Sequence, residues 1–281
     1  MSRLLVALFT VLTVVFPATA QTINFRVHTQ EEILDRLKLA AAQNEERQAA
    51  LKKLFADESC AGDRLTDQAV KHEKLGNVIC TLPGETPDTI LVTAHYDKVK
   101  PGMGVTDNWS GASMLPSLLY GVDGAQRKHT FIFIGFTGEE DGLVGSEFYA
   151  SHLTKEQRSH IRAVINMDTL GLGPTEVWTS RADPQLLKDL INVAVALHAS
   201  VAGMNVDNAG STDSESFAKY KIPRMTLHSL TQETFPILHS DKDQMSVIKP
   251  DDYYTSYKVI SAFLVYLDGT LPLSSPVTAA K

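Results

Sequence analysis

Apolar and polar positions change their spacing along the chain, from a helical period to short apolar runs. Residues 29–55 place leucine and isoleucine at helical spacing, and Thr29 followed by Gln-Glu-Glu is typical of a helix N-cap. We expect one or two helices in this part. Farther on, uncharged runs rich in β-branched and aromatic residues lie between Gly/Pro turns, a pattern that predicts strands. The predicted strands are residues 77–82, 89–94, 130–136, 163–167, 176–179 and 225–228.

Helical segments separate several of these strands. Residues 183–199 open with Asp-Pro, an N-cap followed by proline in the first turn, and residues 251–267 follow another proline. Residues 213–220 predict a short helix. Strands alternating with helices indicate an α/β fold, a three-layer sandwich whose mostly parallel, mixed central sheet is flanked by helices. In such sheets, sites lie outside the carboxyl ends of the strands.

Residues 1–20 have the pattern of a secretory signal. Arg3 supplies the positive start, an apolar run follows, and Pro-Ala-Thr-Ala ends the segment in an Ala-x-Ala cleavage pattern. We expect cleavage after Ala20, an exported protein that is periplasmic or secreted, and a single catalytic domain in residues 21–281. A membrane anchor is the alternative, but the apolar run is shorter than the roughly 20 residues of a membrane span.

Charge and cysteine content narrow the class of protein. The 281-residue chain has a formal net charge of −7 and no Lys/Arg run, so we expect neither nucleic-acid binding nor stable membrane association after signal cleavage. Its two cysteines, Cys60 and Cys80, lack CxxC spacing, which disfavours a thiolate metal site. In an exported protein they are a plausible disulfide, with two free thiols as the alternative. The sequence leaves the oligomeric state open.

Imidazole and carboxylate groups follow the predicted strands. His95 and Asp97 end the strand 89–94 and, being two residues apart, project to the same side in extended structure. A carboxylate beside a metal-bound histidine fixes the tautomer of the ring. A solvated turn containing both residues is the alternative for this pair by itself.

Further acids occupy comparable positions. Glu139 and Glu140 directly follow an apolar strand and point in different directions, so one can bind a metal while the other acts as a general base. Asp107 lies where a loop enters a helix, where it could bridge two cations or cap the helix. Asp168 and His239 add another carboxylate and a second imidazole. Such nitrogen and oxygen donors suit a divalent metal, and the sequence therefore predicts a metal-dependent hydrolase.

Together these segments resemble the M28 family of zinc aminopeptidases over roughly residues 74–267. The segments occur in the family's order: His95-Tyr96-Asp97, Asp107-Asn108-Trp109-Ser110-Gly111, Gly138-Glu139-Glu140-Asp141-Gly142-Leu143-Val144-Gly145-Ser146, Asn166-Met167-Asp168 and His239-Ser240. The resemblance implies the zinc exopeptidase fold and two Zn²⁺ ions per chain. Asp107 would bridge the ions. His95 and Asp168 would complete one zinc site, and Glu140 and His239 the other.

The resemblance also implies how the reaction proceeds. Glu139 would be the general base and later the proton donor, and Asp97 would orient His95. The substrates would be peptides with a free N-terminal amine, from which the first residue is hydrolysed.

Two other functions remain open from the sequence. Secreted glutaminyl cyclases resemble these peptidases and keep nearly the same acids and histidine, but they use one zinc and cyclise an N-terminal glutamine. The uninterrupted segment 139–146 and Leu238 before His239 favour the peptidase, whereas residues 223–239 look cyclase-like. A non-catalytic protein on a degenerate peptidase fold is disfavoured because every proposed ligand and Glu139 are present.

The chain departs from the family pattern in two places. Ser214 stands where the family often has histidine near the substrate pocket, which leaves a pocket or oxyanion contact open. The family usually has adjacent acids after the histidine that matches His239, whereas here Lys242 separates the two acids Asp241 and Asp243. The sequence therefore does not show which residue of this segment supports the metal ligands. Four apolar residues are candidates for a pocket or for the core: Phe217, Met225, Phe235 and Leu238.

Overall fold

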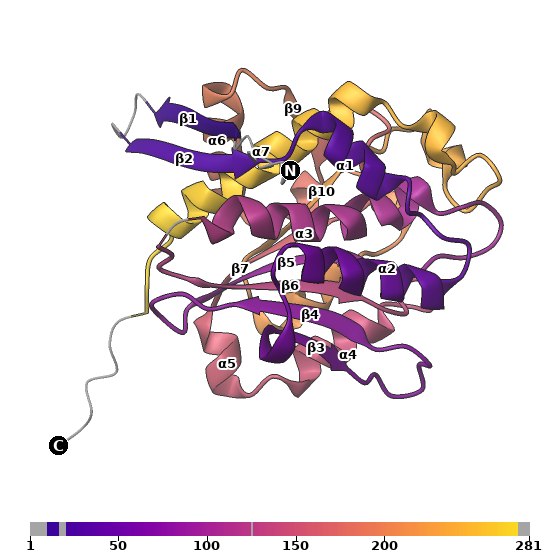
Figure 1. Ribbon diagram of the computed structural model, residues 1–281, viewed down its shortest axis with the longest axis horizontal. Coiled ribbons are helices and arrows are strands. Elements are labelled where there is room, and N and C mark those ends of the chain that lie inside the picture. The colour runs from indigo at the N-terminus through magenta and orange to yellow at the C-terminus, as the bar shows by residue number, and fades with distance from the viewer. Residues whose placement is uncertain (1–9, 17–20, 125, 275–281) are drawn as a thin grey trace, which may run out of the picture.

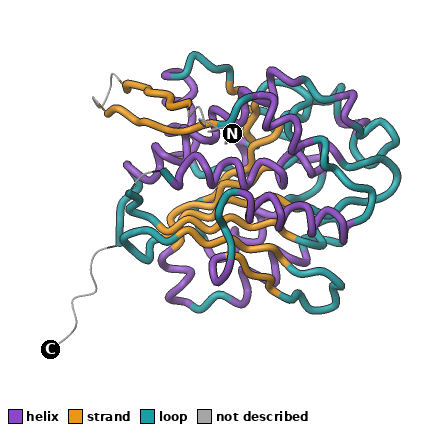
Figure 2. Tube along the Cα trace, viewed as in Figure 1, coloured by secondary structure: helices purple, strands orange, loops and turns teal. Residues whose placement is uncertain are grey.

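The computed structural model describes residues 10–16, 21–124 and 126–274 (Figures 1 and 2). The strands are β1 Thr10–Phe16, β2 Gln21–Val27, β3 Leu65–Gln68, β4 Asn77–Leu82, β5 Thr89–His95, β6 Thr130–Phe136, β7 Ile161–Met167, β8 Thr175–Val177, β9 Val201–Gly203 and β10 Arg224–His228. The α-helices are α1 Gln30–Leu37, α2 Asn44–Asp57, α3 Ser110–Asp123, α4 Val144–His152, α5 Lys155–His160, α6 Pro184–Ala196 and α7 Pro250–Thr270.

Eight strands form the central sheet in the order β3-β4-β6-β5-β7-β10-β8-β9. The middle strands β6, β5, β7 and β10 are parallel to one another, and β8 is parallel to β9. The remaining pairs, β3–β4, β4–β6 and β10–β8, are antiparallel. Helices α2, α3 and α7 lie on one side of the sheet and α4 and α5 on the other (Figure 1). The predicted three-layer α/β sandwich is confirmed.

The middle of the sheet contacts a hydrophobic core on each face. All seven residues of β5 are buried, and its side chains alternate, with Val92 in the larger core and Leu91 in the smaller one. A strand covered on both faces is expected to be a continuous apolar run. Of the residues considered for a pocket, Phe217 lies in the smaller core and Met225 in the larger one.

Most predicted elements occur within a few residues of their expected bounds, and one predicted strand was wrong in detail. The strand expected at 176–179 ends at Val177, because the backbone turns into a short 3₁₀ segment at Thr179–Arg181. There the amide of Ser180 donates to the side-chain oxygen of Asn205 rather than to a neighbouring strand. The short helix expected at 213–220 is confirmed, and it is a 3₁₀ helix, Asp213–Tyr220.

The N-terminal strands form a separate two-stranded antiparallel sheet. Strand β2 buries Ile23, Phe25 and Val27 and packs on α3 and α7. Residues 17–20, which contain the expected cleavage point, lie outside the described residues. Among the helices of the described part, none has the length and apolar character needed to cross a membrane.

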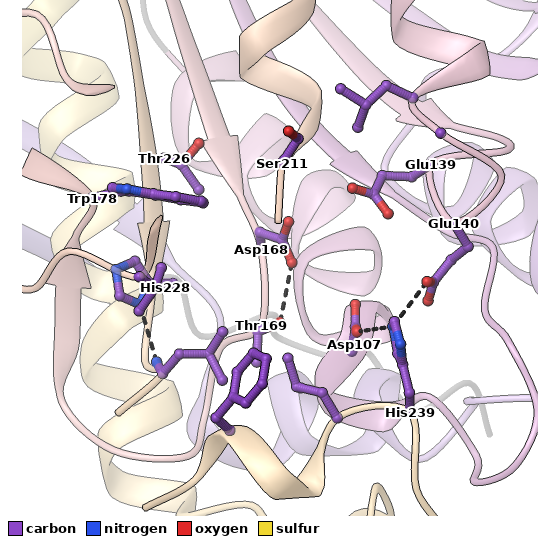
Figure 3. A pocket seen from close by; sticks show the side chains of 16 residues that line it. Asp107, Glu139, Glu140, Asp168, Thr169, Trp178, Ser211, Thr226, His228 and His239 are labelled. Carbon is purple, nitrogen blue, oxygen red and sulfur yellow. Dashed lines mark hydrogen bonds and ion pairs between the residues drawn. The ribbon is translucent and has the colours of Figure 1, made fainter. Parts of the chain in front are cut away.

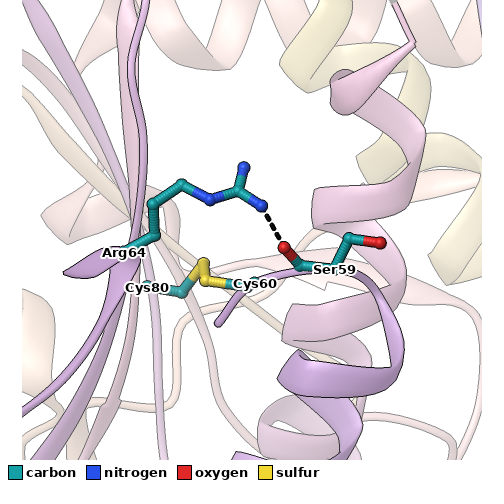
Figure 4. The surroundings of a disulfide bond; sticks show 4 residues. All are labelled: Ser59, Cys60, Arg64 and Cys80. Atoms are coloured by element: carbon teal, nitrogen blue, oxygen red, sulfur yellow. Dashed lines mark hydrogen bonds between the residues drawn. A yellow bond between two sulfur atoms is a disulfide. The ribbon is translucent and has the colours of Figure 1, made fainter. Parts of the chain in front are cut away.

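Cys60 and Cys80 form a disulfide, with their Cα atoms 6.3 Å apart (Figure 4). Both residues are fully buried. The bond joins the segment that follows α2 to strand β4, and in a chain-entropy view a loop of this length adds about 3 kcal/mol of stability. The alternative of two free thiols is thereby excluded, and α2 is covalently anchored to the sheet.

Candidate metal centre

The predicted site residues meet at the carboxyl edge of the parallel strands. His95 is the last residue of β5, the acids 139–140 follow β6, and Asp168 follows β7. Because these strands are parallel neighbours, their ends reach the same edge. Asp107 comes from the turn before α3, and His239 from the loop after β10. Residues separated by up to 144 positions (239 − 95) thus line one site.

Asp107 lies between the two histidines. Its Oδ1 is 3.2 Å from Nε2 of His95, and its Oδ2 is 3.1 Å from Nε2 of His239. A further carboxylate lies near each imidazole: Glu140 Oε2 is 2.9 Å from His239 Nε2, and Asp168 Oδ1 is 3.8 Å from His95 Nε2. Figure 3 shows Glu140 and Asp107 converging on His239. Asp107 therefore has one oxygen in each of two donor groups.

Crowding of acids and imidazoles shifts their protonation. Burial by itself would lower the pKa of His95, but Glu139 and other carboxylates around the ring raise it well above its usual value. Contacts with Asp107 and Glu140 raise the pKa of His239 to about 10. Burial raises the pKa of Glu139 to about 10, because His95 offsets only part of the penalty and nearby carboxylates add to it. A bound cation would favour the ionised acids and the neutral imidazoles.

The donor set fits a divalent metal. Two groups have ligand atoms that all lie within 4.8 Å of one another: His95 with Asp107 and Glu140, and His95 with Glu139 and Asp168. Nε2 of His95 and Oε1 of Glu140 are buried and have no hydrogen-bond partner among the described residues. Most buried polar atoms have a hydrogen-bond partner, so these two atoms are available to a ligand. Nitrogen and oxygen donors of this kind suit zinc.

Asp97 supports the site mainly through backbone groups. Nδ1 of His95 lies 3.2 Å from the backbone oxygen of Asp97, and since a carbonyl only accepts, Nδ1 carries the proton. This leaves Nε2 as the ligand atom. The carboxylate, 3.5 Å from the ring, accepts hydrogen bonds from the amides of Glu139 and Glu140, both at 3.2 Å. Asp97 therefore holds the turn that presents both acids, a contact that the sequence argument missed.

Asp168 and Asp107 are also held in place by hydrogen bonds. Thr212 Oγ1 donates to Asp168 Oδ2 at 2.6 Å, and Thr169 Oγ1 donates to Oδ1 at 3.1 Å. The buried carboxylate of Asp243 accepts the amides of Thr106 at 2.7 Å and of Asp107 at 3.1 Å. Asp241, on the other side of the interrupting lysine, is exposed. Asp243 is thus the acid of this segment that supports a ligand.

A cavity of about 490 Å³ opens beside the acids (Figure 3). Phe235 and Leu238, two of the pocket candidates, line it. Ser214 does not line it, because its hydroxyl is buried 2.9 Å from that of Thr226. The apolar part of the wall consists of Leu143, Trp178, Val206, Leu230, Phe235 and Leu238.

Two ring side chains of this cavity were not found by sequence reasoning. The indole nitrogen of Trp178 donates to Asp207 at 2.9 Å, which fixes the ring at the wall. His228 accepts the amide of Leu230 through Nδ1 at 3.0 Å and donates from Nε2 to the Met204 carbonyl at 3.1 Å. Burial lowers the pKa of His228, so the ring is neutral. In the sequence, only their positions at strand ends could have indicated Trp178 and His228. Many structural residues have such positions.

Known proteins share this sequence pattern and this fold. Aminopeptidase YwaD of Bacillus subtilis is 25% identical over 185 residues, which cover 63% of this chain and 40% of that relative. Across the curated relatives compared, the chain spans between 20% and 63% of their length.

Many solved structures share the fold, and two of them are named for different activities. One is BSAP, a zinc aminopeptidase from Bacillus subtilis, with a TM-score of 0.61 and 23% identity, covering 67% of this chain and 49% of that one. The other is a glutaminyl cyclase from an Acidobacteriales bacterium, with a TM-score of 0.70 and 17% identity, covering 85% of this chain and 94% of that one. At these identities the likeness concerns the fold alone.

The family comparison covers the segment that contains the metal centre. Residues 77–264, more than half of the chain, match the model of peptidase family M28. This segment includes all the residues gathered around Asp107. The chain belongs to peptidase family M28.

Proposed function

We propose that this protein is an aminopeptidase that uses two zinc ions to hydrolyse the N-terminal residue from peptides. The observation that carries the proposal is the position of Asp107, whose two oxygens lie 3.2 and 3.1 Å from the ligand nitrogens of His95 and His239. A carboxylate shared in this way suits a bridge between two cations. Asp168 would join His95 at one ion, and Glu140 would join His239 at the other.

Glu139 has the position of a general base. Its side chain lines the cavity, and its backbone is held by Asp97. Zinc ions at the centre would lower the pKa of water toward about 7 and polarise the scissile carbonyl. The Glu139 carboxylate would accept the proton of the attacking water and return it to the leaving amine when the C–N bond breaks. Glu139 alone would thus take up and release the proton that hydrolysis transfers.

The cavity suits one apolar side chain beside the reacting bond. Trp178, Leu230 and Phe235 lie on its wall together with the acids of the metal centre. A substrate with its first residue in the cavity would place the following peptide bond next to Glu139. Family membership and the aminopeptidase relatives support this exopeptidase assignment.

Glutaminyl cyclisation is the second candidate, and a specific observation favours it. The cyclase structure matches this chain over 94% of its own length. Against this candidate, the segment 139–146 is uninterrupted, and Leu238 precedes His239. Glu140 and His239 beside Asp107 would supply ligands for a second metal, which supports the two-zinc proposal.

We further propose that residues 1–20 act as a cleavable signal and that the mature protein is periplasmic or secreted. The positive start, apolar run and Ala-x-Ala pattern support export. The disulfide between Cys60 and Cys80 is consistent with an oxidising compartment. N-terminal sequencing of protein from the medium and the periplasm tests this, and a chain that starts before residue 21 would contradict it.

The deciding experiment measures zinc content together with turnover of two substrate sets, aminoacyl chromogenic amides and glutaminyl peptides. Two zinc ions per chain with amide hydrolysis would support the aminopeptidase. One zinc ion with pyroglutamate formation and no hydrolysis would make the protein a cyclase. A chain that binds no metal and turns over neither substrate would overturn both candidates.

A further inference from the structure

Arg47 is a fully buried charged side chain behind the metal centre. It comes from α2 and precedes the segment that matches the family. Its guanidinium group donates to four backbone carbonyls. Nε donates to Tyr96, Nη1 to Met103 at 3.0 Å and to Ala41 at 3.3 Å, and Nη2 to Gly104 at 2.9 Å.

Three of these carbonyls belong to the two segments that carry ligands, whereas Ala41 lies in the loop before α2. Tyr96 directly follows His95, and Gly104 lies three residues before Asp107. The Gly104 carbonyl also accepts the amide of Trp109 at 3.1 Å, so it belongs to the turn that contains Asp107. One planar group with donors in a fixed fork therefore joins the end of β5 to the turn before α3.

The charge of Arg47 has no carboxylate in direct contact within the described part of the chain. The guanidinium group lies 5.2 Å from the centre of the Trp109 ring. Burial lowers its pKa to about 10, while Asp97, Asp243 and Asp107 act in the opposite direction, so the group is a cation at neutral pH. The negative charges of these acids favour the guanidinium cation from beyond contact distance.

A contribution to fold stability does not by itself explain why a charged arginine is buried at this position. Burying a charge is costly, and apolar side chains of similar volume often replace buried ions without loss of stability. The position of α2 is also secured separately by the disulfide that follows it. The contacts of Arg47 with Tyr96, Met103 and Gly104, in contrast, set the distance between the segments of His95 and Asp107.

We propose that Arg47 is a positioning residue of the metal centre, which fixes the segments of His95 and Asp107 in the spacing that metal binding requires. The inference rests on the proposed function, because it assumes that these residues bind zinc. Lysine cannot replace arginine in this role, because a single ammonium group cannot reach carbonyls on both segments in the same way.

The test compares R47M and R47K with the wild type and with R36M as a matched control. Arg36 is also largely buried, and its guanidinium group contacts Glu58 and Ser117 rather than the ligand-bearing segments. The zinc dissociation constant is measured by competition with a chromogenic chelator, and the Tm of the metal-free protein is measured in parallel. We expect R47M to bind zinc about 10- to 100-fold more weakly, a typical effect of residues that orient metal ligands.

The other variants separate positioning from stability. R47K should also bind zinc more weakly although it keeps the charge. R36M should have a lower Tm than the wild type and the same zinc dissociation constant. Since Arg47 does not line the cavity, kcat of R47M should fall more than KM rises.

R47M with a lowered Tm but the wild-type zinc constant and kcat would overturn the inference. If R47M does not fold, R47K decides, and wild-type zinc binding by R47K would overturn it equally. A wild type that binds no zinc would refute the proposed function and the inference together. A wild type that binds zinc no more tightly than R47M would refute the inference alone.

Discussion

Strand β5 has a buried acid near one end and a largely buried acid near the other, in opposite surroundings. Asp88, directly before the strand, is 1% exposed and surrounded by donors. Arg162 donates to it from Nε at 2.9 Å and Nη2 at 2.7 Å, His160 Nδ1 is 3.1 Å away, and Ser274 donates from its amide and its hydroxyl. At the other end, Glu139 lies near further acids and one imidazole, His95.

The two acids are therefore shifted in opposite directions. Burial by itself would raise the pKa of Asp88, but donors from Ser274, Arg162 and His160 hold it well below its usual range. Burial raises the pKa of Glu139, and neighbouring acids add to the effect. A satisfied buried carboxylate stabilises the fold, whereas an unsatisfied one in a cavity marks a place where chemistry occurs. Replacing each acid by its amide tests this contrast directly.

The largest effect is expected for Glu139→Gln. Loss of the general base should lower kcat for aminoacyl amides about 10³-fold, since such groups contribute 10²- to 10⁴-fold. The free energy of unfolding of the metal-free protein should stay the same or rise, because a crowded acid is removed. Steady-state kinetics and urea unfolding measure the two effects. A variant that retains near-wild-type kcat would show that another group accepts the proton.

Zinc binding should stabilise the protein through the metal centre at the carboxyl end of β5. This stabilisation should not depend on Asp88 at the other end of the strand. At a free concentration of about 100 times the dissociation constant, zinc should raise the free energy of unfolding by about 2.7 kcal/mol. His239→Ala should lose much of this increment because it removes a ligand, whereas Asp88→Asn should keep it. Urea unfolding with and without zinc provides the measurement. An equal loss in both variants would mean that the two ends are not independent.

Asp88→Asn should act on stability alone. We expect a loss of about 2 kcal/mol at neutral pH, because the substitution removes the charged partner of Arg162 in a largely buried place. The value is below the range for fully buried pairs because the Arg162 side chain is 24% exposed. Activity should stay within about twofold of the wild type, since removing one hydrogen-bonded charge far from the cavity leaves the catalytic groups in place. A large loss of kcat would contradict the separation of the two ends.

The smallest effect is the pH dependence of the difference in unfolding free energy between the wild type and Asp88→Asn. The folded-state pKa of Asp88 lies below its unfolded value of about 3.9. Its stabilising contribution is therefore present above about pH 4 and is lost as the pH falls through the folded-state pKa. The stability difference between the wild type and Asp88→Asn should be constant from about pH 7 to 5 and shrink below about pH 4. A difference that grows on acidification would have the wrong sign for this account.

The sequence was sufficient for the elements and for the edge at which polar residues meet. The apolar run of β6 predicted a central strand, and the acids after it were predicted to lie at its carboxyl end. Because parallel strands end at one edge, His95, Glu139 and Asp168 could be grouped before the structure was known. Their chemical types then predicted a metal site, and the family match agrees with that interpretation.

What holds those residues in place was decided by the tertiary structure. Asp97 accepts backbone amides of the turn at 139–140, and Arg47 donates to backbone carbonyls at Tyr96 and Gly104. Asp88 is satisfied by residues up to 186 positions away. Every non-proline residue has the same amide and carbonyl, so a contact with the backbone leaves no mark in the sequence of its partner. The sequence determined which groups could react, and only the folded chain determined which of them are held, and by what.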